Sequence, residues 1–124
     1  MKTQIISLQM AFFFKSLVSR PDTEFKDINE NVFNIFNAMP QVIPLPEGLP
    51  PDVPMITQRS EDNKYVCNIS RARIDLIFQR TNGEVSNSEV LKDFNAKVNG
   101  FAKYVCGKQD VTRFGLVARY FHEE

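Results

Sequence analysis

The chain begins with a pattern of hydrophobicity that has a period of two residues. Every second residue from Ile6 to Phe14 is apolar, while the alternate residues from Ile5 to Phe13 include polar Ser7 and Gln9 and turn apolar toward the end. Alternation of this kind is typical of a strand with one buried face. We therefore predict a first strand that ends near Phe14, with an apolar second face over its last residues.

Apolar residues then return at helical spacing. They recur between Phe25 and Met39, after Pro21 ends the strand pattern. Either Asp22 or Thr23 is suited to cap a helix that begins there. The helix should end at Met39, because a residue that precedes proline disfavours helical backbone.

Six of the seven prolines lie in one stretch, residues 40–54. An interdomain linker there would leave about forty residues before it, which is too few for a stable domain. We therefore predict a single domain, residues 1–124, with a proline-rich crossover at residues 40–54. Polyproline II backbone rises about 3.1 Å per residue, so this stretch is long enough to cross a sheet whose strands lie about 4.8 Å apart.

Three short strand patterns follow, at Met55–Ser60, Lys64–Ser70 and Arg73–Arg80. Their separators are short and polar, so the three strands should form an antiparallel meander.

A second helix and a last strand complete the chain. Ser86 to Glu89 fits a capping box, an apolar stripe runs from Val90 to Val105, and Gly107 suits the C-cap. The last strand should span about Val111 to Phe121. The predicted fold is α+β, an antiparallel sheet in the order β-α-β-β-β-α-β with both helices packed on one face.

Charge and composition exclude several function classes. Lys+Arg and Asp+Glu number 15 each, so the chain lacks the positive charge of a general nucleic-acid binder. Basic and aromatic residues around the meander could bind single-stranded nucleic acid. We favour this interpretation less, because acidic residues lie among them. No apolar run approaches the length of a membrane span.

The two cysteines, Cys67 and Cys106, form no Cys-x-x-Cys pair. We expect free thiols that pack in the core and a cytoplasmic protein, with one buried bridge as the alternative. The apolar start of the chain lacks a signal-peptide cleavage site, which favours the same location.

No sequence motif dictates a reaction. His122 is the only histidine and should be exposed, so we expect no metal site, no cofactor and no catalytic residue. The weak functional candidates are Asp75, Arg73 and Arg71. Asp75 lies within a strand and is either a buried acid with a raised pKa or, as we favour, a carboxylate paired with a neighbouring arginine.

Surplus apolar residues are the strongest functional signal. Two helices can cover one side of the predicted sheet, and its second side lacks enough charge to face water. We therefore predict a homodimer or higher homo-oligomer whose interface contains five residues: Phe12, Phe13, Phe14, Val117 and Phe121.

Two segments resemble a known family. The stretch from Arg59 to Arg80, with its proline-rich approach, and the closing segment Arg113 to Tyr120 resemble the N-terminal half of a sporadically distributed, uncharacterised bacterial family. That family has a general likeness to SecB-type chaperone subunits, in which helices back a four-stranded antiparallel sheet. The resemblance rests on turn and strand signatures, so it implies a fold and carries over no functional residue. Such proteins usually continue beyond the point that matches Glu124, which implies a short relative or part of a longer chain.

Together these patterns predict a non-enzymatic binding module that acts as a homo-oligomer and recognises peptide along an apolar groove or a sheet edge. The alternative is a small enzyme with a pocket at the subunit interface, where Asp75 and its flanking arginines would be the first candidates.

Overall fold

The computed structural model describes residues 2–32, 34–42, 50–51, 53–81 and 85–123, without the side chains of residues 2, 122 and 123. Six strands and three helices lie in these ranges: β1 (Lys2–Phe14), α1 (Pro21–Glu24), α2 (Ile28–Asn31), β2 (Gln41–Val42), β3 (Ile56–Arg59), β4 (Tyr65–Ile69), β5 (Arg73–Gln79), α3 (Asn87–Lys108) and β6 (Val111–Glu123).

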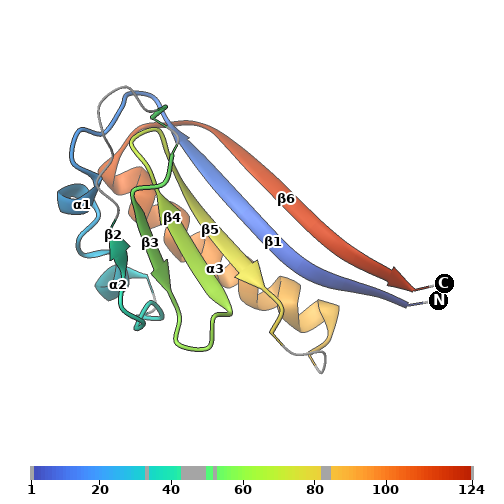
Figure 1. Cartoon of the computed structure of the whole chain (residues 1–124). Helices are drawn as coiled ribbons and strands as arrows, with labels where there is room; N and C mark the ends of the chain where they lie inside the picture. The colour runs from blue at the N-terminus through green and yellow to red at the C-terminus, as the bar shows by residue number, and fades with distance from the viewer. Residues whose placement is uncertain (1, 33, 43–49, 52, 82–84, 124) are drawn as a thin grey trace.

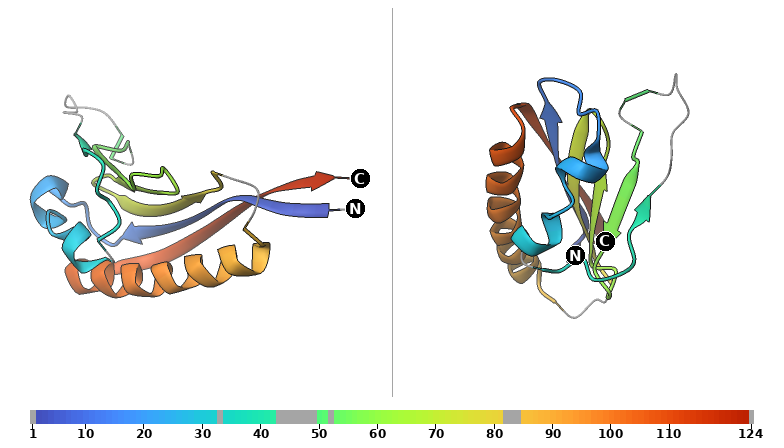
Figure 2. Two further views of the ribbon diagram at one scale, coloured as in Figure 1. Left: turned by 90° about the horizontal axis from the view of Figure 1, so that it is seen from below. Right: turned by 90° about the vertical axis from the view of Figure 1, so that its left-hand side faces the viewer.

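The strands form one antiparallel sheet in the order β2-β3-β4-β5-β1-β6. All three helices lie on the same face of it (Figures 1 and 2). The predicted α+β class and the β3-β4-β5 meander are therefore confirmed. β1 is placed between β5 and β6, so the first strand of the chain joins the meander to the last strand.

The predicted helix that ends at Met39 is wrong in its length. The described residues of this segment form two single-turn helices, α1 and α2, and Asn34 beyond them has a positive φ of 52°. The side chain of Asn29 accepts a hydrogen bond from the backbone N–H of Phe36 at 2.7 Å, and an asparagine that binds backbone in this way competes with helix formation. The helical spacing of apolar residues is real nonetheless, because its members are buried: Phe25, Ile28, Val32 and Phe36.

The predicted crossover at residues 40–54 also needs correction. Gln41 and Val42 already pair with β3 at the far edge of the sheet, as β2, so the chain crosses the sheet through the segment that contains α1 and α2. The proline-rich stretch instead connects two neighbouring antiparallel strands. Residues 43–49 and 52 of the predicted crossover lie outside the described residues.

α3 supplies most of the helical contribution to the core. Its first turn is capped as predicted, because the Ser86 hydroxyl accepts the backbone N–H of Glu89 at 3.2 Å. Its C-cap is Gln109 and not Gly107, which stays within the helix. Four residues spaced along one face are buried against the sheet: Val90, Phe94, Phe101 and Val105.

A β-bulge interrupts β1 between Ile5 and Ser7. The extra residue, Ile6, shifts the alternation by one, so that Ile5 and Leu8 are both buried while Ile6 is partly exposed. A strict period of two had placed Ile6 with Leu8 and Ile5 on the opposite face. Beyond the bulge the ends of β1 and β6 continue past the first turn of α3 as a two-stranded ribbon (Figures 1 and 2).

Arg80 and Asn87 hold the bulge in place. The Asn87 side chain accepts the backbone N–H of Ile5 at 3.0 Å and donates to the carbonyl of Thr3 at 2.8 Å. Arg80 donates from Nε to the carbonyl of Ile5 at 2.6 Å and also reaches the Asn87 amide oxygen. The start of α3 is thereby fixed to β1 at the base of the ribbon.

We predict that Asn87→Ala lowers the free energy of unfolding by about 1–3 kcal/mol, because the partly buried backbone N–H of Ile5 loses its acceptor. Urea unfolding followed by circular dichroism measures the change. The exposed neighbour Ser88→Ala is the control and should stay within about 0.5 kcal/mol of the parent. Equal stability of the two variants would contradict this role for Asn87.

A second polar cluster joins the α1–α2 segment to the end of α3. The Tyr104 hydroxyl donates to the Asp27 carboxylate at 2.6 Å, and the Lys108 ammonium lies 3.4 Å from the same group. The hydrogen bond from Tyr104 lowers the pKa of Asp27, burial opposes it, and the charge of Lys108 adds to the lowering. Burial and the neighbouring Asp27 raise the pKa of Tyr104, so the phenol stays protonated.

This cluster predicts a pH-dependent contribution to stability. A carboxyl group whose pKa is lowered on folding stabilises the protein fully above its unfolded pKa, and that stabilisation is lost as the pH falls below about 4. Asp27→Asn should therefore be less stable than the parent at neutral pH, and the difference should shrink in acid. Urea unfolding at both pH values measures it, with Tyr120→Phe as an exposed control and Tyr104→Phe as the matched removal of the donor. A difference that is independent of pH would contradict the assignment.

Candidate functional site

The described residues concentrate exposed apolar side chains on β6. Phe114, Leu116 and Tyr120 face the helical side of the sheet, because they are paired with Phe12, Met10 and Ile5 of β1. They are nevertheless 65%, 61% and 57% exposed. Contacts from α3 to the sheet go mainly to β1 and β5, so β6 lies outside the area that the helix covers.

An apolar groove runs between α3 and β6, with a volume of about 420 Å³. Leu8 and Met10 of β1 lie at its base, Leu91, Phe94 and Val98 of α3 line one side, and Leu116 of β6 lines the other. The exposed residues Lys92 and Asn95 complete the lining. We call this feature the α3–β6 groove.

The outer edge of β6 is the second unusual feature of this region. β6 is the last strand of the sheet, so no described strand pairs with its outer side over a length of 13 residues. A long unprotected edge presents backbone donors and acceptors to any extended chain. The opposite edge differs, because β2 covers two residues of the described part of the chain and follows Pro40 directly.

The face away from the helices is more polar than the sequence suggested. Phe13 does lie on this face, but the guanidinium groups of Arg73 and Arg113 lie 4.7 and 4.3 Å from the centre of its ring. Stacked cations of this kind let an aromatic ring face water. Val117 and Phe121 share this face and are about half exposed, as the alternation predicted.

Two of the predicted interface residues need correction. Phe12 and Phe14 point toward the helices and are buried in the core, where Phe12 contacts Phe101 and Phe14 stacks on Phe25. The alternation of β1 separates them from Phe13. They are therefore not available at the surface of this chain.

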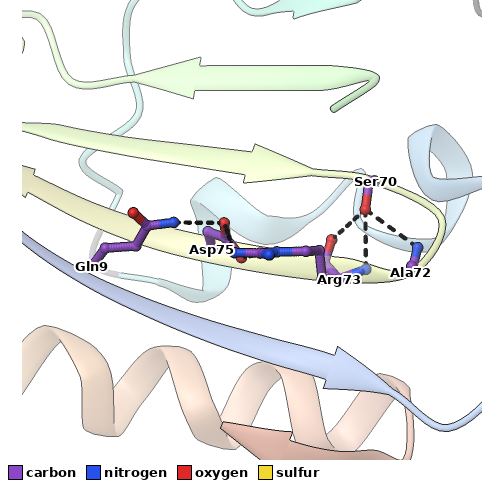
Figure 3. A network of polar contacts seen from close by, with 5 residues as sticks. All are labelled: Gln9, Ser70, Ala72, Arg73 and Asp75. Atoms are coloured by element: carbon purple, nitrogen blue, oxygen red, sulfur yellow. Dashed lines mark hydrogen bonds and ion pairs between the residues drawn. The ribbon is translucent and has the colours of Figure 1, made fainter. Parts of the chain in front are cut away.

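Asp75 is the most buried carboxylate among the described residues, with 6% of its surface exposed. Arg73 binds both of its carboxylate oxygens, at 3.0 and 2.7 Å, and the Gln9 side chain donates to it at 2.9 Å (Figure 3). The carboxylate thus has the arginine partner that we favoured. A hollow of about 150 Å³ beside it is lined in part by Ser70 and Asn68.

Ser70 fixes the turn that carries Arg73. Its hydroxyl accepts the backbone N–H groups of Ala72 and Arg73 at 3.2 and 3.0 Å and lies 3.1 Å from the Arg73 carbonyl (Figure 3). Arg71 is exposed and donates to the carbonyl of Val18. Arg71 therefore joins two loops, and the structure does not bring it to Asp75 by any hydrogen bond between described side chains.

The two thiols lie in different environments, and neither is in a disulfide. Cys67 is fully buried, and burial, with a smaller effect of Asp75, raises the pKa of its thiol. Cys106 is exposed, which corrects the expectation that it packs in the core. The side chain of His122 lies outside the described part of the chain.

A polar hollow of about 450 Å³, between α3, the β3–β4 turn and the residues after α2, was not predicted from the sequence. The Tyr65 hydroxyl donates a short hydrogen bond to Asp93, whose other oxygen lies 3.3 Å from the Lys97 ammonium. Burial raises the pKa of Asp93, but the hydrogen bond from Tyr65 and the charge of Lys97 outweigh it, so its pKa is lowered overall. The only sequence signal was the spacing of Asp93 and Lys97, which is that of a helix ion pair.

Compared with protein-family models, curated proteins and solved structures, the chain matches none. The resemblance to an uncharacterised bacterial family and to SecB-type subunits is therefore an expectation from sequence patterns alone.

Two features are absent from the described ranges. No helix in them is long and apolar enough to cross a membrane. They also contain no group of three or more His, Cys, Asp or Glu side chains arranged to hold a metal ion.

If Asp75 is a structural ion-pair partner, Asp75→Asn should lower the free energy of unfolding by about 1–3 kcal/mol, because Arg73 and Gln9 lose a charged acceptor. Chemical denaturation measures this change. The exposed Glu61→Gln is the control and should change stability by less than about 0.5 kcal/mol. A variant as stable as the parent would show that the ion pair contributes little, and Asp75 would then be a stronger functional candidate.

Proposed function

We propose that this chain is a non-enzymatic interaction module that binds apolar polypeptide segments in the α3–β6 groove and acts as a homo-oligomer. The observation that carries the proposal is the gathering of large exposed apolar side chains on β6 beside a groove with a mostly apolar lining. Contiguous apolar surface of this kind is typical of interaction sites.

Polypeptide is the class of ligand that best fits the surroundings of the groove. An extended chain can offer alternate apolar side chains to such a groove. The groove lies on the helical face of the sheet, between α3 and Leu116 of β6, so it does not use the outer backbone edge of that strand. The general likeness to SecB-type chaperone subunits agrees with this class of ligand.

A small enzyme with a pocket at the subunit interface has less support. Its first candidate, Asp75, is engaged by Arg73 and Gln9, and the hollow beside it is small. A cytoplasmic location is part of the proposal, since free thiols at Cys67 and Cys106 suit a reducing compartment.

Peptide binding tests this proposal. The probe is a short fluorescent peptide in which leucine alternates with serine, and the control peptide has serine in place of every leucine. We predict that fluorescence anisotropy rises with the first peptide and not with the second. Leu91→Ser should weaken binding about tenfold, which corresponds to about 1.4 kcal/mol, since burial of a leucine is worth about 1.5–3 kcal/mol.

Leu17→Ser is the matched control, because Leu17 is equally exposed and is not part of the groove lining. It should bind the peptide as the parent does. Binding that Leu91→Ser and Leu17→Ser weaken to the same extent, or no binding of the leucine peptide, would contradict the proposal.

A further inference from the structure

The two edges of the sheet are built differently. β2 is short and next to a proline, whereas β6 is 13 residues long and carries large apolar residues on both faces. Proteins usually protect such an edge with proline, a short strand or inward charges. We infer that β6 pairs with β6 of a second copy of this chain, antiparallel and around a two-fold axis at Val117. The inference rests on the homo-oligomer in the proposed function and assigns its interface.

Symmetry restricts how two copies of one strand can pair. An antiparallel pair of identical strands has its two-fold axis perpendicular to the sheet, so the helical faces of both copies lie on the same side. Residues directly opposite each other must then share a face. Since the faces alternate along β6, the axis must pass at a residue and not between two residues.

The midpoint of β6 is Val117, so an axis there lets the whole strand pair, from Val111 to Glu123. On the helical face it places Phe114 opposite Tyr120, an aromatic pair of the kind that stabilises sheets. On the other face Val117 lies opposite itself. The remaining pairs of the central region are Leu116 with Ala118, Gly115 with Arg119, and Arg113 with Phe121.

Neighbouring registers are less favourable. An axis at Leu116 would place Arg113 opposite Arg119 in both halves of the pair, and like charges in that position destabilise a sheet. An axis at Ala118 would place Val117 opposite Arg119 and leave the first two residues of β6 without partners. The axis at Val117 avoids the like-charge pair and uses the full strand.

In this arrangement the two-stranded ribbon formed by the ends of β1 and β6 becomes part of the interface. The end of β6 that runs past the first turn of α3 has little core of its own, and pairing places it beside the opposite end of the partner's β6 (Figures 1 and 2). The two six-stranded sheets become continuous, and the two α3–β6 grooves lie on the same side of the joined strands. An apolar floor then extends from one α3 to the other.

Cysteine crosslinking tests the register. The background is Cys106→Ser, in which the remaining Cys67 is fully buried. Chains with Val117→Cys should crosslink to each other under mild oxidation, because the two copies of residue 117 face one another. Arg113→Cys should crosslink to Phe121→Cys in a mixture refolded together, and neither should crosslink to itself, since like residues would lie about 27 Å apart along the strands.

The mass in solution tests the interface itself. Light scattering should give twice 14.3 kDa for the parent chain. Val117→Glu should reduce the mass to that of one chain, because it places like charges together at the axis, and the exposed Leu17→Glu should not. Circular dichroism shows whether Val117→Glu folds, and if it does not, the crosslinks alone decide.

The outcomes separate this inference from the proposed function. A dimeric mass without the 117 crosslink, or with Arg113→Cys linked to itself, overturns the β6 pairing and leaves a homo-oligomer with another interface. A mass of one chain overturns the pairing and the homo-oligomer together. Peptide binding is measured separately and can persist in either case.

Discussion

The width of one helix relative to the sheet determines much of this structure. An α-helix with its side chains is about 10 Å wide and strands are about 4.8 Å apart, so one helix covers about two strands. α3 lies over β1 and β5, and the segment with α1 and α2 packs beside it, where Phe25 meets Tyr104. β6 is left outside this cover. Because no helix covers β6, its apolar side chains are exposed and the α3–β6 groove is open.

The two faces of the sheet expose different kinds of side chains to solvent. On the open face, arginines stack on Phe13, and Asp75 is neutralised by Arg73 and supported by Gln9. On the helical face the uncovered part consists of Phe114, Leu116 and Tyr120, without comparable polar cover from described side chains. Surface available for a ligand or a partner is therefore concentrated on the helical side of β6.

The sequence predicted β1, the β3-β4-β5 meander and β6, because the period of two and the short polar turns are local signals, but it did not predict β2. It failed where side-chain hydrogen bonds to the backbone, or irregular strand pairing, decide the outcome. The apolar spacing from Phe25 to Phe36 looked helical, but asparagine side chains capture backbone groups there and only single turns form. A single extra residue at Ile6 reversed the faces before it. The interface prediction found Val117 and Phe121 by alternation, yet it included Phe12 and Phe14 because three successive phenylalanines do not show which of them face the core.

The unequal edges of the sheet also bear on how far association can proceed. A subunit with two open edges can add copies at both ends, and repeated pairing then builds a filament. Over the residues that the structure describes, one edge here ends in a two-residue strand that follows Pro40, and β6 is the long edge that offers a template. Once that edge is occupied, the joined sheet has a blunt strand at each end. The pairing that we infer for β6 would thus stop after one partner is added, and an exposed apolar strand would not lead to open-ended growth.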